Sequence, residues 1–205
     1  MIDAPGDHPL PHPELQSQSP LVFALHAGGV LFRQHQIVYD PIFFGTTGAY
    51  RFDDPNCPAG ATFGVLYAGE DPHCCFIESC GPTTGVPAVS GAYLDARAIA
   101  KLELTEDLRF IDLASSGGLT RIGADARLVT GSYRLAQRWS AALRVHPSKP
   151  DGIRYPSRHD PTRVAYAIFS RPRSTFGVST MGSLMAPANR LLLNRILHDY
   201  RVDLL

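Results

Sequence analysis

Residues 62–82 read TFGVLYAGEDPHCCFIESCGP and contain the two elements that decide the fold. Their first part, Thr62–Tyr67, is rich in β-branched and aromatic residues, which is typical of a β-strand. Asp71 and Pro72 then form a helix start, because aspartate caps the first turn and proline fits the first helical position. We expect this helix to end near Cys80, before a Gly-Pro pair. The segment therefore predicts a strand that leads directly into a helix.

Further elements are predicted on both sides of this segment, but strands and helices do not alternate regularly. The predicted strands are Val30–His35, Ile99–Thr105, Leu108–Leu113, Ile153–Tyr155 and Val164–Ser170, and the predicted helices are Thr130–Val145 and Pro187–Asp199. We expect strands 99–105 and 108–113 to pair through a tight Glu106-Asp107 turn, and a final strand to follow the last helix. Because a doubly wound sheet requires regular βαβ units, this order favours an α+β fold.

The helix predicted at Thr130–Val145 has the clearest amphipathic pattern. Its apolar residues fall on one stripe at helical spacing, and most of its arginines lie off that stripe. The stripe consists of Leu135, Ala136, Trp139, Ala142 and Leu143. We expect this stripe to pack against the core.

Two stretches lack the pattern of a regular element. Residues 1–20 contain five prolines among Gln, Ser and His. They are predicted to form a leader without regular structure, flexible or draped over a single domain at residues 21–205. Residues 40–60 are rich in Gly, Pro and Asp. A loop of this length in a compact domain is often functional.

The charges of the chain are balanced in number but not in position. The 205 residues include 19 basic and 19 acidic side chains, which excludes binding of nucleic acid or membrane through bulk charge. Residues 1–110 carry 13 acidic and 5 basic residues, whereas residues 111–205 carry 6 acidic and 14 basic residues. Before residue 97 the only cations are Arg33 and Arg51. Such isolated cations in an acidic half indicate binding of a small anionic ligand.

Other sequence features point to a cytoplasmic protein without a metal site. There is no signal-peptide pattern and no apolar run long enough to cross a membrane. The four cysteines fit neither CxxC pairs nor a disulfide framework, so we expect reduced thiols in the core. The dinucleotide-binding GxGxxG, P-loop and HExxH motifs are absent, as is the GxSxG motif of hydrolases.

Six short motifs instead occur in order between residues 31 and 158. They are Leu31-Phe32-Arg33, Phe43-Phe44-Gly45, Tyr50-Arg51-Phe52, Gly64-Val65-Leu66-Tyr67, Phe76-Ile77-Glu78-Ser79 and Gly152-Ile153-Arg154-Tyr155-Pro156-Ser157-Arg158.

This ordered set resembles the RES domain, which is named for an arginine, a glutamate and a serine. The resemblance covers about residues 25 to 170, and its specificity lies in the order of the motifs rather than in any one of them. Two positions depart from the family pattern. Arg51 is followed by Phe52 where many relatives have Arg-Trp, and Pro156 directly precedes Ser157.

The resemblance implies an α+β fold similar to that of ADP-ribosyltransferase toxins. It also implies an enzyme that cleaves the nicotinamide–ribose bond of NAD, either an NAD phosphorylase with inorganic phosphate as co-substrate or an NAD glycohydrolase. Members of the family are toxins that an Xre-type antitoxin commonly silences. NAD and such an antitoxin are therefore the expected partners, and no other cofactor is expected.

Glu78, Arg33 and Ser157 form the predicted catalytic set. Cleavage of a glycosidic bond passes through an oxocarbenium-like state, so a nearby carboxylate is required. Glu78 is assigned to this role and to holding the ribose hydroxyls, although the pattern alone fits a helix-surface glutamate equally well. Ser157 is predicted to bind phosphate or ribose, since no base is positioned by sequence to activate it. The alternative for Ser157 is a turn serine.

Two arginines and three tyrosines complete the predicted NAD site. A lone cation in an apolar strand is costly unless it meets an anion, so Arg33 is expected to grip the pyrophosphate. Arg51 is expected to do the same or to shape the pocket. The alternatives are a solvent-facing side chain for Arg33 and an ion pair of Arg51 with Asp53 or Asp54. The tyrosines, suited to stacking or ribose binding or else to the core, are Tyr67 and, with less support, Tyr50 and Tyr155.

The basic second half leaves further functions open. Its arginines are expected to form a solvated face, with docking of an acidic partner or of a second copy in a homodimer as the alternative. Nucleic-acid binding is disfavoured because aromatic residues are not interleaved with the arginines. ADP-ribosyl transfer to a macromolecule, or a non-catalytic relative that binds a nucleotide or partner, also remain compatible with the sequence.

Overall fold

The computed structural model describes residues 10–81, 87–171 and 176–205. The strands are β1 (Val22–Leu25), β2 (Val30–Gln36), β3 (Val65–Gly69), β4 (Ala88–Val89), β5 (Arg97–Leu104), β6 (Leu108–Asp112), β7 (Gly152–Pro156), β8 (Val164–Phe169), β9 (Phe176–Gly182) and β10 (Asp203–Leu204). The helices are α1 (Pro72–Cys80), α2 (Gly91–Asp95), α3 (Arg127–Thr130), α4 (Tyr133–Arg144) and α5 (Arg190–Tyr200). One-turn 3-10 helices lie at Leu15–Ser17, Thr120–Ile122 and Pro187–Asn189.

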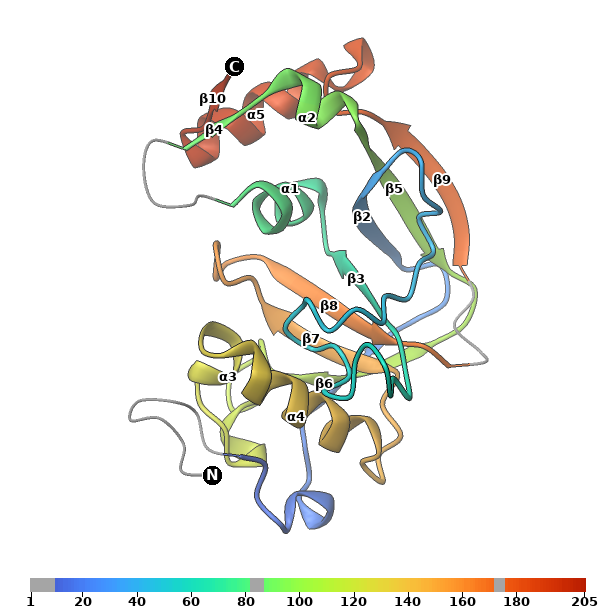
Figure 1. Cartoon of the computed structure of the whole chain (residues 1–205), viewed down its shortest axis with the longest axis vertical. Helices are drawn as coiled ribbons and strands as arrows, with labels where there is room; N and C mark the ends of the chain where they lie inside the picture. The colour runs from blue at the N-terminus through green and yellow to red at the C-terminus, as the bar shows by residue number, and fades with distance from the viewer. Residues whose placement is uncertain (1–9, 82–86, 172–175) are drawn as a thin grey trace.

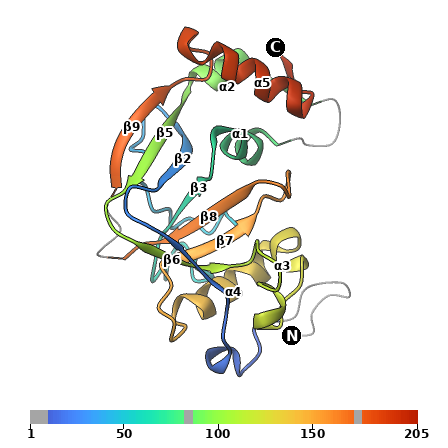
Figure 2. The same ribbon diagram turned by 180° about the vertical axis from the view of Figure 1, so that it is seen from behind.

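Eight of the strands form one curled sheet with helices packed at its two ends (Figure 1). The strand order is β1-β6-β7-β8-β3-β2-β5-β9, and β4 pairs with β10 separately. In the view of Figure 1, α1, α2 and α5 lie in the upper part of the molecule, and α3 and α4 lie in the lower part. Figure 2 shows the same division from behind. The predicted α+β fold is confirmed.

The core is divided into three clusters by this curled sheet. The buried residues of one cluster all lie in strands, among them Leu31, Leu66, Leu102 and Phe110, so the sheet closes over itself without a helix. A second cluster joins α3 and α4 to β6, β7, β8 and β3. The third packs α1, α2 and α5 together. The two helical clusters hold the two ends of the sheet in shape.

The predicted pairing of strands 99–105 and 108–113 is wrong. Both strands form, as β5 and β6, but β5 pairs with β2 and β9 whereas β6 pairs with β1 and β7. The chain around Asp107 bends, but it does not reverse its direction as in a hairpin. This bend lies alongside the similar bend between β1 and β2. Asp107 accepts hydrogen bonds from Ala27 N (2.8 Å), and Gly28 N donates to Leu104 O (2.8 Å). β1–β2 and β5–β6 therefore form one long, bent antiparallel ribbon.

The strand and helix of the opening segment form largely as predicted. α1 starts after Asp71, whose carboxylate accepts a hydrogen bond from Cys74 N (2.8 Å), and it ends before Gly81. The strand begins at Val65 instead of Thr62, because Asp54 takes the Thr62 amide (2.5 Å) into the preceding loop. The strand and α1 consequently meet in a short turn.

The close approach of α1 to β3 requires a small residue at the end of the strand. A Cβ atom added to Gly69 would lie 2.9 Å from the Cβ of Cys74. Cys74 and Cys75 are buried in this contact, and burial raises the pKa of the Cys75 thiol to about 12. All four cysteines are free thiols. The prediction of reduced thiols agrees with this packing.

The helix predicted at Thr130–Val145 is interrupted near its start. Thr130 ends the short α3, and α4 begins at Tyr133. Of the predicted stripe, Leu135, Ala136, Trp139 and Leu143 are buried, and Ala142 is partly buried against the same cluster.

The proline-rich segment is described from residue 10 onward, where it lies against the domain. Leu15 is only 1% exposed and belongs to the core cluster below the sheet, in a one-turn helix that the sequence did not predict. The Gln16 side chain donates to Ala142 O on α4 (3.0 Å). Residues 1–9 lie outside the described residues. The segment at residues 10–20 is thus draped over the domain.

Two strands of the sheet, β1 and β9, were not predicted, and the short final strand was. β10 follows α5 as a two-residue pair with β4. No helix among the described residues is long and apolar enough to cross a membrane.

Candidate functional site

Glu78 and Ser157 meet where the end of α1 faces the loop after β7. Ser157 Oγ donates to Glu78 Oε1 over 2.5 Å, and the backbone N–H of Arg158 donates to the same oxygen (3.2 Å). Ser157 Oγ in turn accepts from the amides of His159 and Asp160, each at 3.2 Å. Since a hydroxyl has one proton and two acceptor positions, these bonds direct the proton of Ser157 toward the glutamate.

The two side chains differ in burial. Ser157 is 2% exposed, whereas Glu78 follows the buried run of α1 and is exposed to solvent. The hydrogen bonds from Ser157 and Arg158 both go to Oε1, and no described residue donates to Oε2. Glu78 is therefore a carboxylate with one oxygen fixed by the protein and one oxygen open to a ligand.

Arg51 lies in the long loop and points inward. Its guanidinium donates to Gly131 O (2.8 Å) and lies 4.6 Å above the Tyr133 ring. Arg51 is 6% exposed. Its Nη2 atom is buried and has no hydrogen-bond partner among the described residues. Burial lowers the pKa of Arg51, while the negative charge of Glu78 acts in the opposite direction. Arg51 is thus a buried cation with one unsatisfied donor group near the glutamate.

The alternative of an ion pair between Arg51 and its acidic neighbours is wrong. Asp54 instead accepts from Thr62 and Phe63, and Asp53 accepts from the Tyr67 hydroxyl (2.9 Å). Both carboxylates therefore shape the loop. Among the described residues Arg51 forms no ion pair, although the charge of Glu78 acts on it.

Helix α4 holds the loop that carries Arg51. Gln137 donates to the carbonyls of Gly48 and Tyr50, each at 2.9 Å, and Ser140 donates to Phe52 O (2.6 Å). These bonds fix the backbone on both sides of Arg51. The long loop is consequently ordered by a helix from the second half of the chain.

Arg33 lies in β2 and is partly buried rather than directed freely to solvent. Its guanidinium donates to Phe43 O (3.0 Å) at the start of the long loop. Burial lowers the pKa of Arg33, and the nearby Tyr50, Cys75 and Asp40 act against this. Arg33 is thus beside Tyr50, and no contact with Glu78 is found in the described structure.

The three predicted tyrosines occupy different places. Tyr50 is exposed, and its ring centre lies 5.4 Å from that of Tyr67. The Tyr67 hydroxyl is already bonded to Asp53 and to Phe52 N, so only its ring is available for stacking. Burial raises the pKa of Tyr155 well above its ordinary value, and Glu78 contributes to this rise. Tyr155 therefore lies near the glutamate, beneath the site.

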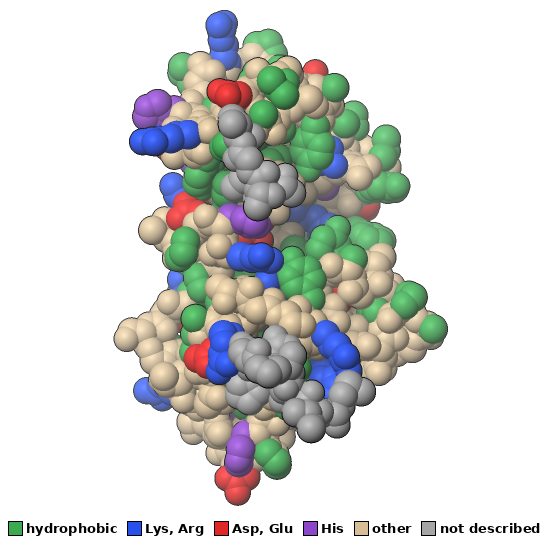
Figure 3. All heavy atoms as spheres, turned by 60° about the vertical axis from the view of Figure 1, so that its left-hand side comes forward, with side chains coloured by type: hydrophobic (Ala, Val, Ile, Leu, Met, Phe, Trp, Pro, Cys, Tyr) green, Lys and Arg blue, Asp and Glu red, His purple; other side chains and the backbone are tan. Residues whose placement is uncertain are grey.

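The structure thus groups the predicted residues around two centres. Glu78, Ser157, Arg51 and Tyr155 interact electrostatically or by hydrogen bonds. Arg33, Tyr50 and Tyr67 form a second group along the same loop. Figure 3 shows acidic, basic and histidine side chains together at the middle of one face, between the upper and lower parts of the molecule.

Comparison with known families identifies the family of this chain. The family model described as "RES domain" matches residues 30–188, which is more than half of the chain. The chain belongs to the RES family. A curated relative, "Probable toxin y4kH" of Sinorhizobium fredii (strain NBRC 101917 / NGR234), is 33% identical over 114 residues, covering 55% of this chain and 87% of the relative.

The fold of this RES domain also resembles a solved structure. A chain in the crystal structure of the M. tuberculosis MbcT-MbcA toxin-antitoxin complex superposes with a TM-score of 0.53 at 15% identity. The match covers 78% of the present chain and 87% of that chain. At this identity the likeness concerns the fold alone.

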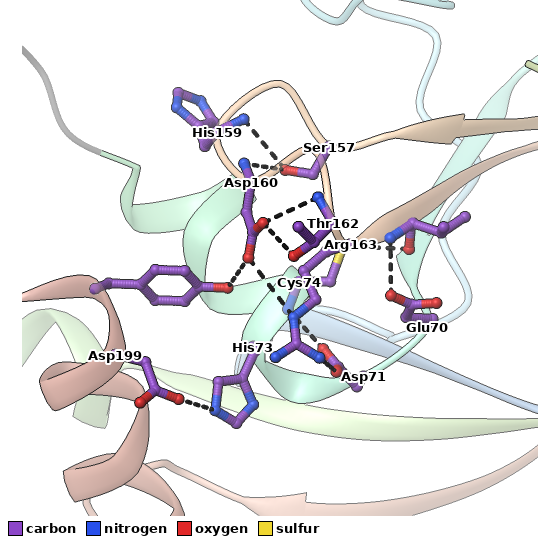
Figure 4. A network of polar contacts seen from close by, with 12 residues as sticks. Glu70, Asp71, His73, Cys74, Ser157, His159, Asp160, Thr162, Arg163 and Asp199 are labelled. Carbon is purple, nitrogen blue, oxygen red and sulfur yellow. Dashed lines mark hydrogen bonds and ion pairs between the residues drawn. The ribbon is translucent and has the colours of Figure 1, made fainter. Parts of the chain in front are cut away.

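Sequence reasoning missed two kinds of residue in the RES site. Arg158 was named in the last motif but given no role in the site, yet its amide donates a hydrogen bond to Glu78 and its charge lowers the pKa of Arg51. Its position next to Ser157 was the available signal. Asp160 and Arg163 fix the Ser157 loop in Figure 4. Their links to Tyr200 and Asp71 had no signal, because these partners lie far away in the sequence.

The basic second half is not a uniform solvated face in the RES domain. Arg154 pairs with buried Asp112 (2.8 Å), and Arg163 pairs with Asp71. Arg171 donates to Arg144 O (2.9 Å). The Arg144 guanidinium itself lies 4.9 Å above the Phe63 ring. These four arginines are used inside the domain, whereas Arg134 and Arg138 are exposed on α4, as the solvated-face prediction expects.

Proposed function

We propose that this RES domain degrades NAD by cleaving the bond between nicotinamide and ribose, and that it acts as the toxin of a toxin–antitoxin system. The observation that carries the proposal is the Glu78 carboxylate held by Ser157 at 2.5 Å, close to the buried cation Arg51. A fixed carboxylate beside cations suits a substrate that has both a developing positive centre and a pyrophosphate. The names of the relative and of the structural neighbour support the assignment to a toxin.

Glu78 and Ser157 have different roles in the proposed reaction. Glu78 stabilises the positive charge that develops at the ribose as neutral nicotinamide leaves with the bonding electrons. Its open oxygen accepts a hydrogen bond from a ribose hydroxyl. Ser157 fixes the carboxylate, because its only proton is directed to it. A charge fixed before substrate arrives needs no reorganisation during the reaction.

The cations of the site serve the phosphates. Arg51 has a buried donor group without a partner in the described chain, and a phosphate oxygen would satisfy it. Arg33 and the exposed Arg158 extend this positive region on either side. The rings of Tyr50 and Tyr67 supply a stacking surface for a planar base.

The acceptor of the ribosyl group distinguishes two reactions of the same site. Attack by inorganic phosphate yields a phosphorylated ADP-ribose, and attack by water yields ADP-ribose with release of one proton. Incubation of the purified protein with NAD, with and without phosphate, followed by product identification separates a phosphorylase from a glycohydrolase. Label from NAD on protein or nucleic acid would instead indicate ADP-ribosyl transfer.

The decisive variant is Glu78→Gln, which keeps the size of the side chain and removes its charge. We expect NAD consumption to fall by at least about 100-fold, the typical effect of removing one electrostatic stabiliser. Glu103→Gln is the matched control, because Glu103 is an exposed glutamate on β5. Full activity of Glu78→Gln would contradict the mechanism. NAD binding without turnover in the wild-type protein would instead indicate a non-catalytic relative.

The toxin assignment has its own test. Expression of the wild-type chain should lower cellular NAD and stop growth, and Glu78→Gln should do neither. We propose an Xre-type antitoxin as the protein partner that restores growth. Size-exclusion chromatography with light scattering of the purified chain tests the proposed homodimer separately.

A further inference from the structure

The loop that presents Ser157 is closed by its own backbone. Ser157 N donates to Arg163 O (2.8 Å), and Arg163 N donates to Asp160 O (2.9 Å). The amides of His159 and Asp160 both point to Ser157 Oγ, as Figure 4 shows. The direction of the serine hydroxyl therefore depends on the conformation of residues 157–163.

The carboxylate of Asp160 holds this conformation from several sides. Its Oδ1 accepts from Thr162 N (3.0 Å) and Thr162 Oγ1 (2.6 Å). Its Oδ2 accepts from the hydroxyl of Tyr200 on α5 (2.9 Å) and lies 3.6 Å from Arg163 Nε. Burial alone would raise the pKa of Asp160, but the hydrogen bonds of Thr162 and Tyr200 and the charge of Arg163 hold it below its ordinary value. Asp160 is thus an ionised anchor between the loop and α5.

Arg163 connects this loop to the helix that carries Glu78. Its guanidinium pairs with Asp71 Oδ2, and Asp71 Oδ1 caps α1 by accepting from Cys74 N (2.8 Å). The carbonyl of the same arginine accepts from Ser157 N. One residue therefore ties the start of the Glu78 helix to the Ser157 loop (Figure 4).

We propose that Asp160 is a positioning residue for the Glu78–Ser157 pair, anchored by Tyr200 and by the Arg163–Asp71 ion pair. This proposal rests on the proposed function. Asp160 acts through Ser157, because its own amide and the loop that it stabilises direct the serine proton to Glu78. Without its carboxylate, the loop loses its bonds to α5 and to Thr162, and the serine hydroxyl is free to turn away.

The kinetic test is Asp160→Ala, compared with Asp199→Ala. We expect Asp160→Ala to lower kcat for NAD cleavage about 100-fold, a typical cost of misplacing a reacting group, with KM within about threefold. Asp160 and Asp199 both line a polar cavity of about 660 Å³. Asp199 contacts His73 (3.5 Å) and not the loop, so Asp199→Ala should keep the wild-type kcat. Asp160→Asn retains an acceptor for Thr162 and should regain part of the kcat.

A milder variant keeps the proposal testable if Asp160→Ala does not fold. Tyr200→Phe removes only the hydroxyl that donates to Asp160, and we expect a smaller fall in kcat at unchanged KM. A change confined to KM, or an equal loss in Asp199→Ala, would overturn the proposal. So would a wild-type kcat per folded molecule in both Asp160→Ala and Tyr200→Phe.

Amide hydrogen exchange of the free protein tests the same inference without substrate. The amides of His159 and Asp160 should exchange faster in Asp160→Ala, as they should in Ser157→Ala, and at the wild-type rate in Asp199→Ala. If the wild-type protein consumes no NAD, the proposed function fails and this exchange measurement still decides the role of Asp160. Unchanged exchange in Asp160→Ala would overturn it.

Discussion

Arg51 shows how a single residue combines a structural bond with an unused charge. One arm of its guanidinium satisfies the carbonyl of Gly131, and the buried Nη2 has no partner in the described chain. An unpaired buried donor costs free energy that a ligand can return. Under the proposed function, a phosphate oxygen of NAD would be that ligand.

Replacement of Arg51 by lysine tests this interpretation. Lysine keeps the charge but has no fork with which to hold a carbonyl and a phosphate together. We expect Arg51→Lys to raise KM for NAD about tenfold with a smaller effect on kcat, as steady-state kinetics would show. Arg138→Lys on the exposed face of α4 serves as the control. Unchanged KM for Arg51→Lys would remove Arg51 from the binding site.

The residue types of the candidate site could be predicted from the sequence, but their contacts could not. The rarity of cations before residue 97 singled out Arg33 and Arg51. The hydrogen bond between Glu78 and Ser157 joins residues that are 79 positions apart in the sequence, so no local sequence pattern could predict it. The sequence also gave no sign of a base beside Ser157, whereas the structure places the Glu78 carboxylate there.

At the scale of elements, the strand pair β6–β7 depends on a buried ion pair. Asp112 Oδ1 accepts from Arg154 (2.8 Å) and from the amides of Ala114 and Ser115. Burial alone would raise the pKa of Asp112, but the hydrogen bonds of Ser115 and Arg154 outweigh it and lower the pKa. The folded state therefore favours the ionised carboxylate.

We expect Asp112→Asn to lower the free energy of unfolding by about 3 kcal/mol at pH 7, because the partly buried Arg154 loses its anion. The wild-type advantage should be complete above the ordinary carboxyl pKa, near about 4, and should vanish as the pH falls through the lower folded pKa. Urea unfolding of both proteins between pH 2 and pH 7 measures this difference. A difference independent of pH would contradict the role of the charge.

Elements with strong local signals were predicted well, and those defined by distant partners were not. The Asp71 cap and the apolar stripe of α4 are local, so α1 and most of α4 were found. β1 and β9 pair only with strands far along the chain. Glu106 and Asp107 were predicted to form a hairpin turn, because a short polar pair between two strands usually does so. Only the pairing of the whole sheet shows that the chain bends there and that the two strands have other partners.

At the scale of the molecule, the ribbon made by β1–β2 and β5–β6 joins the two ends of the sheet. We expect both ends to unfold together. The single tryptophan, Trp139, lies in the lower cluster and reports that end by fluorescence, whereas far-ultraviolet circular dichroism reports the whole chain. Coincident urea transitions of the two signals are the expected result. An earlier transition of either signal would show that the ends are independent.

The same ribbon has a consequence for the chain as it leaves the ribosome. Val30 pairs with Glu103, so β2 lacks one of its neighbouring strands until residue 103 has been made. At the usual speed of synthesis the intervening residues take roughly 4 to 15 s. During that interval β2, whose first three residues are apolar, lacks its partner β5, and Glu78 lacks its partner Ser157. The hydrogen bond between Glu78 and Ser157 can therefore form only after residue 157 has been made.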